Sequence, residues 1–122
     1  MKSYRLILGI CLVGIVNGAF AADPDGWVKL CVRENLDILD ASDTIAGPGE
    51  WPTMLNLPGA ARIDWSDAAN SLEIGAKARA YFWEDANFAD DMIEFGPGRI
   101  VNRLDEYNFG DEIDAMKIAC LS

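Results

Sequence analysis

The chain contains no histidine, and this absence narrows the chemistry that its side chains can perform. Catalysis by a Ser–His or Cys–His pair and the usual zinc sites all need imidazole. The ligand atoms that remain are oxygens. The 20 Asp and Glu residues, with amides and backbone carbonyls, can bind a hard cation such as calcium. Hydrolysis by two carboxylates stays open, but adjacent acids such as Asp90-Asp91 and Asp105-Glu106 point apart, so we expect a binding protein and not an enzyme.

The first 21 residues have the composition of a secretory signal peptide. Basic residues at 2 and 5 precede an apolar run over 6–16, and Ala19-Phe20-Ala21 forms an A-x-A cleavage site. A membrane anchor is the alternative, but the run is shorter than the roughly 20 residues that span a bilayer. We therefore expect secretion, and a mature chain of one domain over 22–122 with no membrane span.

Removal of the leader leaves 8 basic and 20 acidic residues, a net charge of −12. Such a surface repels phosphate backbones and anionic lipid, so we expect no nucleic-acid partner. Cations and basic surfaces are favoured as partners. The alternative is that the charge serves only solubility.

Cleavage also removes Cys11 and leaves two cysteines, Cys31 and Cys120. In an oxidising compartment, two cysteines most simply form one disulfide. The bridge would close nearly the whole domain, which corresponds to about 4–5 kcal/mol by loop entropy. The alternative is two buried free thiols.

Three short matches indicate that the mature chain is a tandem repeat. They keep their order while their spacing changes, as in a duplicated unit with variable loops. The pairs are 31–35 with 81–85 at an offset of 50, Gly-Pro-Gly at 47–49 with 96–98 at 49, and 67–74 with 111–118 at 44.

Apolar and polar residues alternate with period two in several short stretches, which is typical of half-buried strands. We expect four strands in motif one (about 27–76), at 27–34, 42–46, 53–57 and 70–76, and four in motif two (about 77–120), at 77–84, 91–96, 99–104 and 114–120. Residues 105–114 should form a long ordered loop. Its counterpart, 59–69, should hold one helical turn, and Trp51 and Trp65 are assigned to the surface.

The second motif resembles a Greek key motif of the βγ-crystallin superfamily. That motif has an aromatic residue followed by Glu, a second aromatic five residues after the first, and Gly two positions later. Trp83, Glu84 and Phe88 match, and Asp90 stands at the Gly, where Asp tolerates positive φ. The first motif matches more loosely, through Glu34. The resemblance implies an all-β, two-sheet Greek key β-sandwich of two tandem motifs, of the non-lens microbial type.

The resemblance also implies two calcium sites, because family members bind calcium in paired loops. One predicted site comprises Asp111, the Glu112 carbonyl and Asp114, with Glu34; the other comprises Asp67, the Ala68 carbonyl and Asn70, with Glu84. We expect the Asp111/Asp114 site to be the better one, since a carboxylate is a stronger donor than the usual hydroxyl. The alternative is that these side chains only tie down their own loops by Asx-type hydrogen bonds.

The predicted function is that of a secreted, monomeric binding domain with calcium as its ion and an extracellular protein as its partner, in a structural or stress role. Two alternatives stay open. An inhibitor of secreted peptidases would present a rigid exposed loop, for which Gly47–Pro52 is the candidate. A secreted toxin or host-directed effector is the other, although a basic, membrane-seeking surface is missing.

Overall fold

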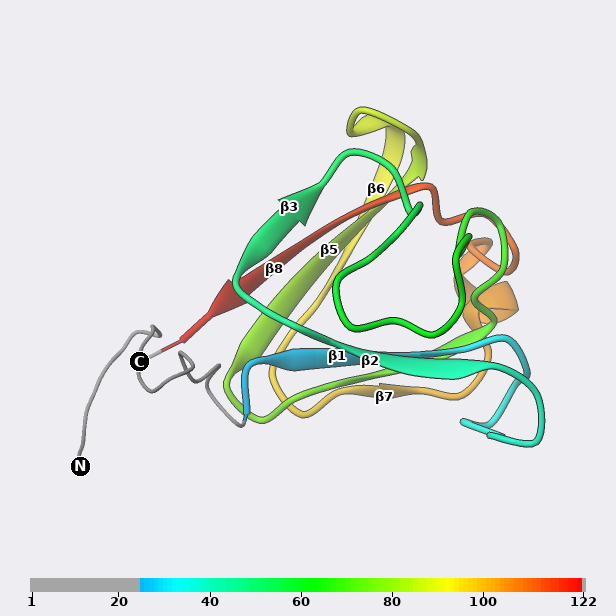
Figure 1. Ribbon diagram of the computed structural model, residues 1–122, viewed down its shortest axis with the longest axis horizontal. Helices are drawn as coiled ribbons and strands as arrows, with labels where there is room; N and C mark the ends of the chain where they lie inside the picture. The colour runs from blue at the N-terminus through cyan, green and yellow to red at the C-terminus, as the bar shows by residue number, and fades with distance from the viewer. Residues whose placement is uncertain (1–24, 122) are drawn as a thin grey trace.

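The computed structural model describes residues 25–121, which form two four-stranded antiparallel sheets (Figure 1). The first sheet has the order β2-β1-β4-β7 and the second the order β3-β8-β5-β6. The predicted all-β, two-sheet sandwich is confirmed. The strands are β1 (Trp27–Cys31), β2 (Ser42–Ala46), β3 (Gly49–Trp51), β4 (Ser71–Ile74), β5 (Ala78–Asp85), β6 (Ala89–Phe95), β7 (Ile100–Val101) and β8 (Ala115–Cys120), with a 3₁₀ helix η1 (Leu104–Tyr107) before β8.

Each repeat gives one strand to the sheet of the other repeat. β3 belongs to the first repeat but pairs with β8, and β7 belongs to the second repeat but pairs with β4. Figure 1 shows the two sheets meeting as a wedge, with the long loop between β3 and β4 (green) on the near side. Because of this exchange, neither repeat can form its sheet alone, and the two repeats make one interlocked unit.

The register of the sheets corrects the predicted alignment of the two opening strands. Cys31 pairs with Ser71, and Trp83 pairs with Ala115. Ser71 and Ala115 are 44 residues apart, as predicted, but Cys31 and Trp83 are 52 apart, so the predicted offset of 50 is wrong by two. The hairpin turns agree, because positive φ occurs at Asn35-Leu36 and again at Asn87-Phe88, also 52 residues apart.

The core lies between the sheets and includes side chains from the long loop over 52–69. Leu30, Leu72, Phe82 and Met116 come from the strands and are fully buried. Trp65 is also fully buried, so its predicted place on the surface is wrong. The largest buried side chains from this loop are Met54, Leu57 and Trp65. The loop is therefore part of the folded core, not an excursion over it.

Asp43 on β2 fixes this loop. Its carboxylate accepts hydrogen bonds from the backbone of Ala61 (2.9 Å) and Arg62 (3.0 Å) and from Trp65 Nε1 (2.9 Å). Desolvation raises the pKa of Asp43, but these three bonds outweigh it and lower the pKa below the usual value. The loop is thereby held where its last residues, 67–70, can meet the second repeat.

Three local predictions are wrong. Residues 53–57 are not a strand; the third strand is β3, which begins four residues earlier, and Leu55 makes only an isolated bridge with Asp64. The segment 59–69 has no helical turn; the N–H of Ala68 bonds to Trp65 O in a turn. Gly47–Pro52 is not a free loop, because β3 pairs with β8 and Trp51 packs on the core.

The predicted disulfide is also wrong, since Cys31 and Cys120 are free thiols. Cys120 Sγ lies 3.9 Å from Gly26 O, just before β1, whereas Cys31 ends β1. A five-residue strand spans roughly 16 Å, and a disulfide needs Cα atoms within about 7 Å. Burial raises the pKa of both thiols, that of Cys120 to about 11, so both stay protonated at neutral pH.

The predicted signal peptide over 1–21 lies outside the described residues. Within residues 25–121, none of the helices has the length and apolarity to cross a membrane.

A chain of residues 22–122, unfolded in guanidinium without reductant, should react with two equivalents of a thiol reagent. The two cysteines sit at opposite ends of β1, so neither can oxidise the other in the folded state. Cys120→Ser should cost less than about 1 kcal/mol of stability. Absence of reactive thiols in the unfolded, unreduced protein would show that the bridge exists.

Candidate metal centre

Two polar loops, residues 67–70 and 111–114, lie side by side between the sheets. They are joined by two reciprocal backbone hydrogen bonds, Asp67 N to Ile113 O (3.1 Å) and Asp111 N to Ala69 O (3.2 Å). Asp67 and Asp111, which open the loops, both have positive φ (55° and 57°). Asp is among the residues that tolerate this conformation, which explains its place at both turns. The loops are therefore related by a pseudo-twofold axis.

Each loop is also tied to the opening hairpin of its own repeat. Asn70 N donates to Cys31 O and Asp114 N donates to Trp83 O, both at 2.9 Å. Two equivalent corners result. The first corner comprises Asn70, Asp111 and the hairpin residues 32–35; the second corner comprises Asp67, Asp114 and the hairpin residues 84–87.

This arrangement corrects the predicted grouping of ligands. The prediction placed Asp111 with Asp114 and Asp67 with Asn70, each pair within one loop. Because the loops run antiparallel, the first residue of each faces the fourth residue of the other. Asn70 Nδ2 lies 2.8 Å from Asp111 Oδ1, and the carboxyl of Asp67 faces that of Asp114. Each corner thus takes one polar-loop side chain from each repeat.

The first corner is closed by hydrogen bonds. Asn70 Nδ2 donates to Val32 O and to Asp111 Oδ1, both at 2.8 Å. Ser71 Oγ donates to Arg33 O (2.6 Å) and accepts from Leu36 N (3.0 Å), which fixes the hairpin. An open cavity of about 500 Å³ lies here. Every one of these side-chain contacts is between a donor and an acceptor.

Arginines pair with two of the four acids that border the first corner. Glu34 forms an ion pair with Arg103 (3.3 Å), and Asp37 forms one with Arg33 (3.4 Å). The predicted ligand Glu34 lines the first corner with Asn70 and with its predicted partner Asp111, and its carboxylate already has a cationic partner.

Gly110, which precedes the second polar loop, lies against the side chain of Asp105. A Cβ at Gly110 would lie 2.0 Å from Asp105 Oδ1. Asp105 lies in η1, and its carboxylate occupies space that a side chain at 110 would need.

In the second corner acidic side chains face one another, and the backbone N–H of Asp67 offsets part of their effect on Asp114. Desolvation and then the facing Asp67 carboxyl raise the pKa of Asp114 to about 6, and Asp85 adds to the shift. Asp114 Oδ1 is buried and has no hydrogen-bond partner among the described residues. The pKa of Asp85 is raised by desolvation and by the nearby Asp90 and Asp67. Asp67 and Asp85 are exposed and Asp114 is half-buried, so the three acids border one corner at the surface of the domain.

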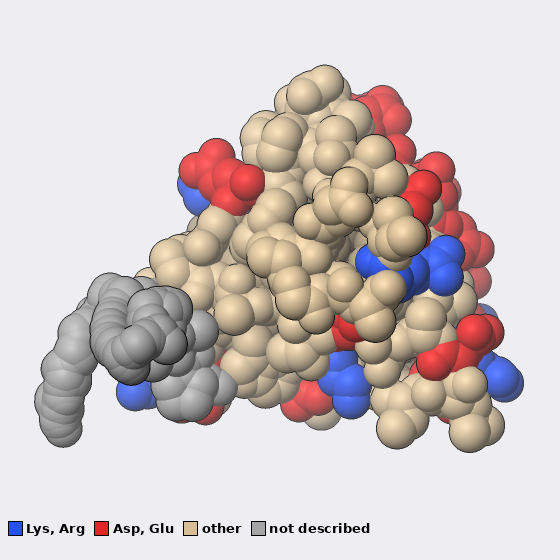
Figure 2. Space-filling view, viewed as in Figure 1, with Lys and Arg blue, Asp and Glu red and all other residues tan. Residues whose placement is uncertain are grey.

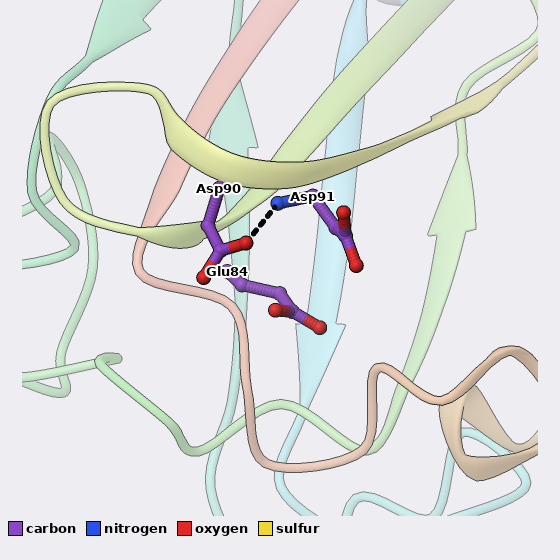
Figure 3. A group of neighbouring side chains, drawn as sticks. All are labelled: Glu84, Asp90 and Asp91. Atoms are coloured by element: carbon purple, nitrogen blue, oxygen red, sulfur yellow. Dashed lines mark hydrogen bonds between the residues drawn. The ribbon is translucent and has the colours of Figure 1, made fainter.

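Further acids surround the second corner. Carboxylate oxygens of Glu84, Asp90 and Asp91 lie within 4.8 Å of one another, and Figure 3 shows the three side chains at the β5–β6 hairpin. Desolvation, followed by Glu112, Asp91 and Asp90, raises the pKa of Glu84. The predicted ligand Glu84 thus directs its carboxylate to this outer group.

None of the four ion pairs within residues 25–121 involves an acid of the second corner or of the outer group. Figure 2 shows acidic side chains following one another along the right-hand edge of the molecule. The two corners therefore differ in electrostatics although they share one backbone design: two acids of the first corner are paired with arginines, and no acid of the second corner is.

Sequence reasoning missed Asp85, because the offset of 50 aligned it with Asn35. The offset of 52 aligns Asp85 with Arg33 and Glu84 with Val32. The Asn-Leu pair at 35–36 and the Asn-Phe pair at 87–88 indicate the offset of 52 in the sequence. The predicted carbonyl donors, Ala68 and Glu112, accept no hydrogen bond from the backbone of residues 25–121, so both oxygens keep their lone pairs.

No protein-family model matches the chain, and no curated protein matches it in sequence. Solved structures do match. A structure described as "Evolution of the eye lens beta-gamma-crystallin domain fold" has a TM-score of 0.68 at 21% identity, covering 85% of this chain and 96% of that one. The N-terminal domain of Protein S gives 0.62 at 15% (77% and 96% covered), and a βγ-crystallin domain from Clostridium beijerinckii gives 0.60 at 20% (75% and 95%). The chain has the βγ-crystallin fold, as the resemblance implied.

The ion-free protein should lose stability as pH rises from about 4 to 6. The folded pKa of Asp114 lies above its ordinary 3.8, so the folded state holds more protons than the unfolded state in this window. Asp114→Asn should remove this dependence and raise the melting temperature at pH 8 by a few degrees, since an amide can donate to Asp67 as Asn70 donates to Asp111. The measurement is melting temperature against pH with a chelator present. An unchanged pH profile in Asp114→Asn, or an equal change in the exposed control Asp40→Asn, would contradict this assignment.

Proposed function

We propose that this protein is a secreted, calcium-binding βγ-crystallin-like domain whose ion binds at the second corner. The observation that carries the proposal is Asp114 Oδ1, a buried oxygen without a donor among residues 25–121, in a corner where Asp67 and Asp85 add two more carboxyls. Buried oxygens are nearly always satisfied by a hydrogen bond or an ion. A cation supplies the missing partner and removes the repulsion at the same time.

The donor set is one that calcium uses. The carboxylates of Asp67, Asp85 and Asp114 would hold the ion. The backbone carbonyl of Glu84 holds the place that Val32 O has in the first corner, and the Glu112 carbonyl is without a donor from the described backbone. Oxygen-only ligands of this kind suit calcium, with water completing the shell. Bound there, the ion would join the two repeats at the point where their loops cross.

Metal binding occurs on this fold elsewhere. A double mutant of clostrillin in which two serines are replaced by histidines, 18% identical with a TM-score of 0.60, has been solved in complex with nickel. That protein carries introduced histidines, whereas the present chain has none, so its own chemistry points to a harder ion.

The leader over 1–21 supports an extracellular location, where calcium is abundant. A stabilising ion that closes a small domain without disulfides fits a structural or stress role outside the cell, with no reaction catalysed. The inhibitor alternative loses its candidate loop, because residues 49–51 are paired in the second sheet.

Calcium should raise the melting temperature by roughly 5–15 °C at about 10 mM, on the basis of the affinities typical of extracellular modules and the linkage of binding to folding. Sodium at equal ionic strength should have little effect, because screening alone does not supply a ligand for Asp114. Asp67→Asn should abolish most of the calcium-induced rise, and Asp40→Asn, which removes the same charge from an exposed loop, should retain it. The measurement is thermal unfolding with calorimetric titration. No heat of binding and no rise in the wild type would refute the proposal.

A further inference from the structure

The backbone has the same arrangement in the two corners, but one equivalent position carries a hydrogen-bond donor in the first corner and an acceptor in the second. Asn70 and Asp114 are equivalent: each is the fourth residue of its polar loop, each precedes a closing strand, and each backbone N–H bonds to the opening strand at 2.9 Å. The side chain of Asn70 can donate hydrogen bonds, whereas ionised Asp114 can only accept.

The donor of Asn70 sits between two oxygens that a cation would otherwise bridge. Its Nδ2 lies 2.8 Å from the Val32 carbonyl and 2.8 Å from the Asp111 carboxylate. The amide has two N–H bonds, and both are used. In the second corner the equivalent oxygens are the backbone carbonyl of Glu84 and the carboxyl groups of Asp67 and Asp114. None of these three residues has a side-chain N–H to donate.

We propose that the side-chain amide of Asn70 takes the place of a metal ion in the first corner, so that the domain binds one ion rather than two. The number of bound ions in this proposal rests on the proposed calcium binding. The closure of the first corner by the amide does not, because it follows from hydrogen bonds that need no ion.

The rest of the first corner supports this assignment. Ser71, fully buried, bonds to both Arg33 O and Leu36 N and thereby fixes the hairpin that presents Val32 O. The equivalent residue in the second corner is Ala115, which has no hydroxyl. The second hairpin is instead held by the edge-on contact of Trp83 with Phe88, with ring centroids 5.0 Å apart.

The two arginines beside the first corner also disfavour an ion there. Glu34 and Asp37, the acids of this hairpin, are each paired with an arginine. An entering cation would have to break both bonds of the Asn70 amide and approach Arg33 and Arg103. Rotation of the amide would turn an oxygen to the ion but would leave its nitrogen without these two acceptors.

The first test uses the calcium-free protein. Asn70→Asp replaces the donor with a carboxylate that faces Asp111, and Asn70→Ser removes the bridging amide without adding charge. In chelator we expect the melting temperature to fall by roughly 5–15 °C in both, and further in Asn70→Asp. Asn56→Asp is the matched control, since Asn56 is exposed, has positive φ and lies outside the corner. Variants within about 2 °C of wild type would overturn the claim that the amide closes the corner.

The second test counts ions. Calorimetric titration with calcium should give one ion for wild type and two for Asn70→Asp, which places two facing loop carboxylates in the first corner as in the second, with Arg33 where the second corner has Asp85. The side-chain ¹⁵NH₂ resonances of Asn70 should keep their shifts throughout the wild-type titration, while the backbone signals of residues 112–114 move. Two ions in wild type, or no second ion in Asn70→Asp, would overturn the inference. Absence of any binding in wild type would refute the proposed function alone, because the melting comparison in chelator still decides the role of Asn70.

Discussion

The two reciprocal hydrogen bonds between the polar loops are the constraint on which the rest of the structure depends. Asp67 N reaches Ile113 O, and Asp111 N reaches Ala69 O. These bonds place the first residue of each loop against the fourth residue of the other. They also sit directly before β4 and β8, the strands that accept β7 and β3 from the opposite repeats. The strand exchange and the two corners are therefore consequences of one pseudo-twofold crossing.

Much of the fold was predictable from the sequence, because period-two alternation and repeated anchors report strands and duplication directly. β2 and β8 fall where predicted or within one residue, and the offset of 44 between the closing strands is correct. The opening strands were misaligned because the match of Glu34 with Glu84 outweighed the Asn pairs that mark the turns. The burial of Trp65 depends on its bond to Asp43, which no local pattern reports.

The site was predictable in composition but not in grouping. The oxygen-bearing residues of the polar loops were predicted through the resemblance to the βγ-crystallin motif, which assigns them by position. Their assignment to two corners needs the antiparallel crossing of the loops, which is a tertiary contact over 41 residues between Asn70 and Asp111. The disulfide failed for a similar reason: Cys31 and Cys120 stand near the ends of their repeats in sequence, but at opposite ends of β1 in space.

The two halves of this duplicated domain differ most at one position, where an amide closes one corner and a carboxylate leaves the other to a cation. A crystal structure grown with calcium and collected for anomalous scattering tests this difference most directly. We predict a single anomalous peak among the carboxylates of Asp67, Asp85 and Asp114, with the Asn70 amide still bonded to Val32 O and Asp111. A peak between Asn70 and Asp111, or an ion-free second corner in which Asp114 is satisfied by a protein donor, would contradict it.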